Sequence, residues 1–232
     1  MKNRKRVYKA VSVVAEGSEF AVMLDSKTIK TPAGLVLKAP HEALAKCIAD
    51  EWDSQVESIN PNAMPITRIL SIALDRVPHD RPALIDDIVN YSGSDLRCYR
   101  ALDEVGALQA KHHQPVLDWA ATQGIALDVT DNVMPITQPQ ASLDAVREMV
   151  SKADDIELAA LAMATPLLGS AVLALALWKG AITIDQAIVC ARIDEEFQAA
   201  KWGQDPEAKA QWMKREVDIR GSAIVLAFFL DS

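Results

Sequence analysis

Apolar residues in the first forty positions recur at roughly every second residue and are interrupted by turn-forming residues. Val7, Val11 and Val13 lie among polar neighbours, and residues 20–24 form a second apolar run. Glycine, proline and aspartate triplets separate such runs, at Glu16-Gly17-Ser18, Asp25-Ser26-Lys27 and Pro32-Ala33-Gly34. Short strands joined by turns of this kind are typical of a meander. The pattern predicts strands at residues 7–14, 20–24, 28–31 and 35–37.

The spacing of apolar residues changes from two to nearly four after Pro40. Leu44, Cys47, Ile48 and Trp52 fall at i, i+3, i+4 intervals, which is typical of an amphipathic helix. The same spacing, between cap and breaker residues, predicts helices at 41–56, 66–77, 82–91, 103–123, 142–152, 154–178, 183–202 and 206–229. Ser142 is expected to cap its helix, and residues 127–129 to be briefly extended. The fold class is therefore α+β, with a small N-terminal β-rich domain (1–40) and a larger all-helical domain (41–232).

One helical segment has the length of a membrane span. Residues 158–178 contain no charged side chain, and about twenty apolar residues can cross a bilayer. The segment is rich in alanine, is interrupted by Pro166 and Gly169, and is flanked by Glu157 and Lys179. These features favour a buried central helix, so no stable membrane insertion is expected. A membrane-attached factor remains the alternative for this segment.

The composition is that of an ordinary globular protein, with half of the residues apolar and a quarter charged. The net charge of −8 argues against a nucleic-acid partner. The three cysteines, Cys47, Cys98 and Cys190, form no CxxC pair and support neither a disulfide framework nor a zinc knuckle. A bacterial cytoplasm is the expected location, because a mitochondrial matrix protein would require a targeting segment that the first residues do not show.

Motifs that carry enzyme chemistry are missing. The sequence has no phosphate-binding glycine loop, no nucleophile elbow and no HExxH pair. His112 and His113 are adjacent on a predicted helix and point about 100° apart, which disfavours a shared metal. No catalytic residue, metal ligand or cofactor is therefore expected. Asp194, Glu195 and Glu196 are the densest acidic group. Paired carboxylates can do acid–base work only where they converge in a cleft, and three consecutive residues fan out around a helix, so a solvated helix face is expected from the residues alone.

Several sequence blocks together resemble a known family. They are Lys30-Thr31-Pro32-Ala33-Gly34, Ala49-Asp50-Glu51-Trp52-Asp53-Ser54-Gln55, Met64-Pro65-Ile66-Thr67-Arg68, Asp95-Leu96-Arg97-Cys98-Tyr99-Arg100, Pro115-Val116-Leu117-Asp118-Trp119-Ala120, Arg192-Ile193-Asp194-Glu195-Glu196-Phe197-Gln198 and Lys201-Trp202-Gly203. In this order and spacing the chain resembles, over about residues 25–203, the chaperones that assemble the alpha subunit of F-type ATP synthase. The blocks containing Trp52 and Trp202 are specific in combination.

The resemblance implies a function and a partner. Members of this family bind the unassembled alpha subunit, shield the surface that later meets the beta subunit, and need neither ATP nor metal. An isolated subunit exposes an apolar interface that aggregates, so a covering protein is physically reasonable. The alternative is a helical small-ligand binder or an enzyme of unknown chemistry, which a ligand-dependent rise in melting temperature would reveal.

The resemblance also implies which residues meet the partner. Its acidic stretch corresponds to Asp194, Glu195 and Glu196, which are then either a contact with the partner or an ion pair that positions the domain. The Trp-Gly pair that follows contains Trp202. Tryptophan is enriched at interface hot spots. Five further residues in the matching blocks are either structural or in contact with the partner, and they are Trp52, Asp53, Arg68, Arg100 and Trp119.

Overall fold

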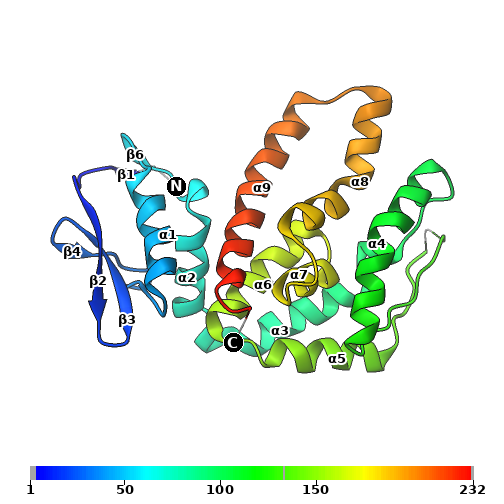
Figure 1. Ribbon diagram of the computed structural model, residues 1–232, viewed down its shortest axis with the longest axis horizontal. Coiled ribbons are helices and arrows are strands. Elements are labelled where there is room, and N and C mark those ends of the chain that lie inside the picture. The colour runs from blue at the N-terminus through cyan, green and yellow to red at the C-terminus, as the bar shows by residue number, and fades with distance from the viewer. Residues whose placement is uncertain (1–3, 133, 231–232) are drawn as a thin grey trace.

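The computed structural model describes residues 4–132 and 134–230, in which short strands lead into a group of packed helices (Figure 1). The strands are β1 (Arg4–Lys5), β2 (Val11–Glu16), β3 (Glu19–Leu24), β4 (Lys27–Thr28), β5 (Lys38–Ala39) and β6 (Ser58–Ile59). The helices are α1 (Glu42–Asp53), α2 (Pro65–Asp75), α3 (Val77–Gly93), α4 (Glu104–Thr122), α5 (Gln140–Ser151), α6 (Asp155–Leu168), α7 (Ala171–Trp178), α8 (Ile184–Trp202) and α9 (Pro206–Ala227). The predicted α+β class is confirmed.

The sheet is built around β3. It pairs antiparallel with β2, with Val13 opposite Val22, and both β4 and β5 pair with β3 as well. The β2–β3 turn contains Gly17 at φ 70, a conformation that favours glycine. The strand expected at residues 7–14 begins only at Val11, as β2, because Tyr8 turns inward and its hydroxyl donates to the Trp52 carbonyl at 2.6 Å. The strands expected at 28–31 and 35–37 are reduced to β4 and a bridge between Lys30 and Val36.

Helix α1 connects the sheet to the helices. It packs on β2 and β3. The predicted boundary at residue 40, which assigns this helix to the helical domain, stays a prediction. At its C-terminal end, the Glu51 carboxylate accepts hydrogen bonds from the backbone N–H groups of Ile66 (2.7 Å) and Thr67 (2.8 Å). An acidic side chain at a helix N-terminus satisfies donors that have no partner within the helix. Glu51 thereby fixes the start of α2 against the end of α1.

Two predicted helix starts were wrong. Helix α3 begins at Val77 rather than Pro82, and Pro82 lies inside it. Pro78 occupies the first turn, where the missing N–H costs nothing, so the proline that marks the start is the earlier one. Helix α5 begins at Gln140 with Pro139 as its cap. Ser142 is instead buried inside the helix, and its hydroxyl donates to the Ala126 carbonyl.

The segment expected to form one long central helix is divided into α6 and α7. Gly169 adopts the left-handed conformation at φ 63, and Ser170 caps α7 by accepting from the Leu173 N–H at 3.0 Å. The buried Asp95 carboxylate accepts from the Ser170 hydroxyl (2.8 Å) and from the Val172 N–H (3.0 Å). A carboxylate 75 residues earlier in the chain therefore stabilises the new helix start.

Burial is confirmed for most of this segment. Every residue of α7 is buried, whereas α6 leaves Pro166 exposed and Ala162, Met163 and Leu167 partly exposed. Helices α2, α3 and α9 pack around α6. Within residues 4–132 and 134–230, no helix combines the length and hydropathy needed to cross a membrane. Residues 127–129 form no strand, and only a parallel bridge joins Tyr99 to Thr130 nearby.

Candidate partner-binding surface on helix α8

Helix α8 packs against the core with one side of its first half, and its second half lies at the surface. Thr183 and Gln186 form a capping box at its start, with the Thr183 hydroxyl accepting from the Gln186 N–H at 3.2 Å. Its buried residues are Ala187, Cys190 and Ile193, and every later residue of the helix is partly or fully exposed. Figure 1 shows this outer half of α8 joined by a short loop to the outer half of α9. The sequence-predicted site residues Asp194, Glu195, Glu196 and Trp202 all lie on it.

The three acidic side chains have different partners. The Asp194 carboxylate accepts a hydrogen bond from the side-chain Nε2 of the buried Gln109 on α4 at 2.6 Å. The side-chain Oε1 of Gln109 in turn accepts from the Ala101 N–H at 2.8 Å. Asp194 therefore braces α8 against α4. Glu196 forms an ion pair with Arg192, and Glu195 lies 3.9 Å from the Arg192 Nε. The two glutamates are more than half exposed and remain open to a partner.

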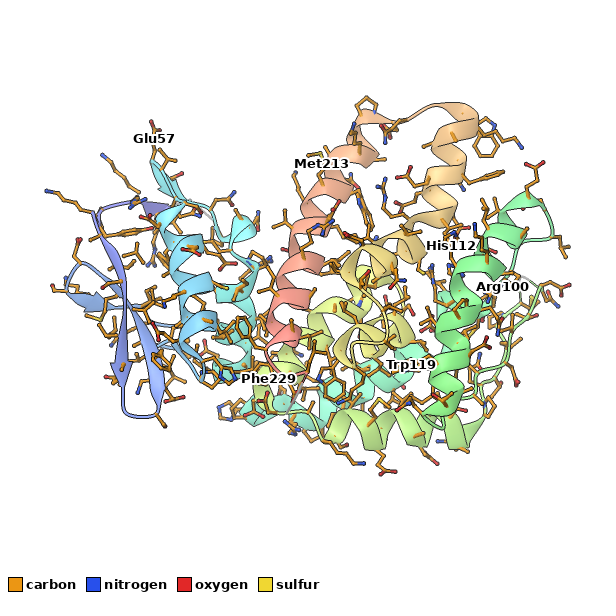
Figure 2. All side chains as sticks on the ribbon, viewed as in Figure 1. Glu57, Arg100, His112, Trp119, Met213 and Phe229 are labelled. Carbon is orange, nitrogen blue, oxygen red and sulfur yellow. The ribbon has the colours of Figure 1, made fainter. Side chains whose placement is uncertain are left out.

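The outer half of α8 has a groove on each side. Glu196 lines the groove of about 430 Å³ toward α4, which is walled mainly by apolar side chains of Leu108, Ile188, Val189, Ile193, Phe197 and Ala200. Figure 2 shows His112 of α4 beside this groove. Glu195 lines the groove of about 630 Å³ toward α9, together with Trp202. Trp202 is 72% exposed, which is high for a residue type that usually contributes much apolar burial.

The other residues suggested by the sequence lie elsewhere and have partners within the protein. Trp52 and Asp53 end α1, where the Trp52 ring lies 5.9 Å from the Tyr8 ring and Asp53 pairs with Arg6 at 3.1 Å. Arg68 of α2 forms an ion pair with Asp218 of α9. Trp119 of α4 is half-buried against the core. The structure does not bring these four residues to the surface of α8.

Arg100 belongs to a buried polar cluster that the sequence did not predict. Arg97, 3% exposed, donates from its guanidinium to the Cys190 carbonyl of α8. The ring of His113 is buried beside it, with Nε2 3.0 Å from the same carbonyl and Nδ1 3.5 Å from the Arg100 guanidinium. The Nε2 atom also lies 2.9 Å from the Arg97 guanidinium, so the ring is held between one carbonyl acceptor and two guanidinium donors. The only sequence signal was the arginine pair within the block 95–100, and an arginine gives no indication of burial by itself.

This cluster holds the inner half of α8 in place. Burial, together with the positive charges of Arg97 and Arg100, lowers the pKa of His113 to about 3. The histidine is thus neutral in the folded protein over the physiological range. Its neutral ring and the two guanidiniums join the α4 side of the molecule to the first half of α8, so that the acidic residues further along are set at a defined distance from α4.

Acidification should therefore reduce stability through His113. In the unfolded chain a histidine has a pKa near 6.5 and takes up a proton below it, whereas the folded protein must bury the ring neutral down to about pH 3. The stability contribution is complete above the unfolded pKa and is lost as pH falls. We expect the free energy of unfolding to fall by about 2 kcal/mol between pH 7 and pH 5. Denaturant melts at the two pH values measure it.

The control for this prediction is a matched substitution. In the His113→Gln variant, the decrease in the free energy of unfolding from pH 7 to pH 5 should be smaller by about 2 kcal/mol. The same change at the exposed His79 should leave that decrease as it is in the wild type. An identical pH dependence in wild type and His113→Gln would show that another group is responsible.

Comparisons with known proteins agree with this architecture. The family profile described as ATP12 chaperone protein matches residues 5–121. The crystal structure of Atp12 from Paracoccus denitrificans is 37% identical with a TM-score of 0.86, and the match covers 97% of each chain. The Atu1473 protein of Agrobacterium tumefaciens, a putative chaperone by its description, is 41% identical with a TM-score of 0.90, over 96% of this chain and 85% of that one.

A more distant relative extends the match to a eukaryote. The mitochondrial protein atp12 of Schizosaccharomyces pombe is 23% identical over 223 residues, which cover 88% of this chain and 75% of the relative. Fold and sequence together define a non-enzymatic chaperone that serves as an assembly factor for ATP synthase. The chain belongs to the ATP12 chaperone family, and the family predicted from the sequence blocks is confirmed.

Proposed function

We propose that this protein binds the unassembled alpha subunit of F-type ATP synthase and shields its subunit interface until assembly. The outer half of α8 is the contact surface in this proposal. The observation that carries it is the exposure of Trp202, at 72%, on a helix end with an open groove on either side. Exposed aromatic anchors next to grooves are the usual centres of protein interfaces.

The surface suits a reversible cover. Its apolar groove toward α4 can bury side chains of an oligomer interface, and the exposed Glu195 and Glu196 can steer the encounter with a basic region of the partner. Charged residues at a rim act mainly on association rate and specificity, so binding can be selective and still be displaced by the final partner. The proposal needs no nucleotide.

The proposal is tested by aggregation of the isolated alpha subunit. Light scattering from that subunit should fall as this protein approaches equal molar amounts, and assembled synthase should not be bound. Trp202→Ala should weaken capture roughly 30-fold, which corresponds to a hot spot of about 2 kcal/mol, with little change in melting temperature. Unchanged scattering at a several-fold excess of wild-type protein would exclude this function.

A charge reversal with a matched control tests the place of contact. Glu196→Lys should weaken capture, more so at low salt, and should change stability by less than about 1 kcal/mol because the side chain is exposed. Glu57→Lys makes the same change at the far end of the molecule, as Figure 2 shows, and should have no effect on capture. Equal effects of the two variants would place the contact elsewhere.

A further inference from the structure

The groove between α8 and α9 contains two hydrogen-bond donors and a lysine that have no partner among the residues that the structure describes. It has a volume of about 630 Å³, and its lining includes Arg192, Glu195, Asp205, Lys209, Trp212 and Arg215. Three of these residues are cationic and two are acidic, on a chain whose net charge is −8. One of the cations, Arg192, already forms an ion pair with Glu196, so the groove is close to neutral on a chain that is acidic overall.

Both acids of the groove lie next to donors of the protein itself. The Asp205 carboxylate caps α9 by accepting from the Glu207 N–H at 2.9 Å. Glu195 lies beside Arg192. Lys209, in contrast, is exposed and forms no ion pair with any residue that the structure describes. A cationic side chain is thus left free on the α9 wall.

Two buried donors in the groove lack acceptors. Trp212 is 6% exposed. The guanidiniums of Arg192 and Arg215 both lie over its ring, 4.7 Å and 5.4 Å from the ring centroid. The Trp212 Nε1 and the Arg192 Nε are shielded from solvent and find no hydrogen-bond partner in residues 4–132 and 134–230. A buried donor without an acceptor costs about 1–3 kcal/mol. An acceptor that enters the groove would recover that cost.

We propose that this groove binds an extended segment of the alpha subunit that carries a carboxylate side chain. The inference rests on the proposed function and adds the chemistry of the bound segment. The carboxylate is placed at the floor, toward Arg192, Lys209 and Trp212, and the apolar flank of the segment lies against Trp202. Gln198 and Gln211 line the walls and can pair with backbone groups. A helical segment fits less well, because its backbone acceptors are already used within the helix.

Synthetic peptides that tile the alpha subunit test the proposal directly. Binding is followed by tryptophan fluorescence and by competition with capture of the whole subunit. At least one peptide containing Asp or Glu should bind and compete, and replacing that acid with Asn or Gln should weaken binding about tenfold, the effect of losing one charge-assisted hydrogen bond. Binding should also weaken as salt is raised.

Variants of the chaperone provide the second arm. Lys209→Glu should weaken peptide binding tenfold or more, whereas Lys214→Glu, an identical change at an exposed α9 position outside the groove, should not. Trp212→Phe keeps an aromatic ring and removes the N–H, and should weaken binding about fivefold at temperatures below its melting point. Because Lys209 is exposed, its substitution tests the groove without threatening the fold.

The outcomes separate this inference from the function on which it rests. If neither Lys209→Glu nor any acidic peptide affects capture of the whole subunit, the groove assignment is overturned. The chaperone function is not affected by that outcome. Failure of the wild-type protein to capture the subunit at all would overturn both. Binding of a peptide that has no acidic residue, with equal loss in Lys209→Glu and Lys214→Glu, would also refute the assignment.

Discussion

Arg97→Met is expected to lower the free energy of unfolding by about 3–5 kcal/mol, as removal of one member of a buried charged network does. The guanidinium is 3% exposed and donates to the Cys190 carbonyl, so the variant leaves that acceptor without its charged donor. The buried Asp95 carboxylate loses a neighbouring positive charge as well. For a chain of this length the melting temperature should fall by roughly 6–20 °C.

A surface arginine is the control for this substitution. Arg147 pairs with Asp86 at 2.6 Å while both side chains remain about half exposed. Arg147→Met should cost less than about 1 kcal/mol, because water screens such a pair. If Arg97→Met were as mild as Arg147→Met, the cluster of Arg97, Arg100 and His113 would not hold α8 to the core. Thermal melts and urea titrations of the three proteins decide between these results.

Leu175→Ala is expected to cost about 2–5 kcal/mol, the range for truncating a fully buried leucine. Leu175 is 0% exposed in the middle of α7, a helix with no exposed face. Truncation leaves a cavity that rigid neighbours cannot fill, and the lost contacts add to the lost transfer free energy. Chemical denaturation measures the change.

Leu102→Ala provides the matched control because Leu102, just before the start of α4 in the sequence, is 84% exposed. The same chemical change there should alter stability by less than about 0.5 kcal/mol. A loss below about 0.5 kcal/mol for Leu175→Ala would contradict the central place of α7 in the core. Leu168→Ala at the end of α6, where 1% is exposed, should behave like Leu175→Ala.

Features that depend on neighbouring residues in the chain could be predicted from the sequence. The helices at 183–202 and 206–229 were expected close to their observed limits, since Thr183 and Asp205 satisfy the first backbone donors of α8 and α9 from within one turn. The β2–β3 hairpin follows from its glycine turn in the same way. The family was also predictable, because its sequence blocks occur in a fixed order.

The division of the acidic triplet could not be predicted in this way. Three consecutive residues on a helix point in different directions, but only packing decides what each one meets. Asp194 became a brace because α4 brings Gln109 to it, and Glu195 and Glu196 stayed available on two sides of Arg192. The sequence therefore made the triplet a candidate contact site, and the tertiary structure separated the structural acid from the exposed ones.

For the central apolar segment, too, the sequence predicted one property and the tertiary structure decided another. Its composition determined that it would be buried, since a run without charge has no other stable place in a globular protein. Its division at Gly169 was decided by Asp95, which accepts hydrogen bonds from Ser170 and Val172 across a long separation in sequence. Periodicity reports local spacing only. A helix start made by a distant carboxylate, like a groove made by two diverging helices, exists only once the chain has folded.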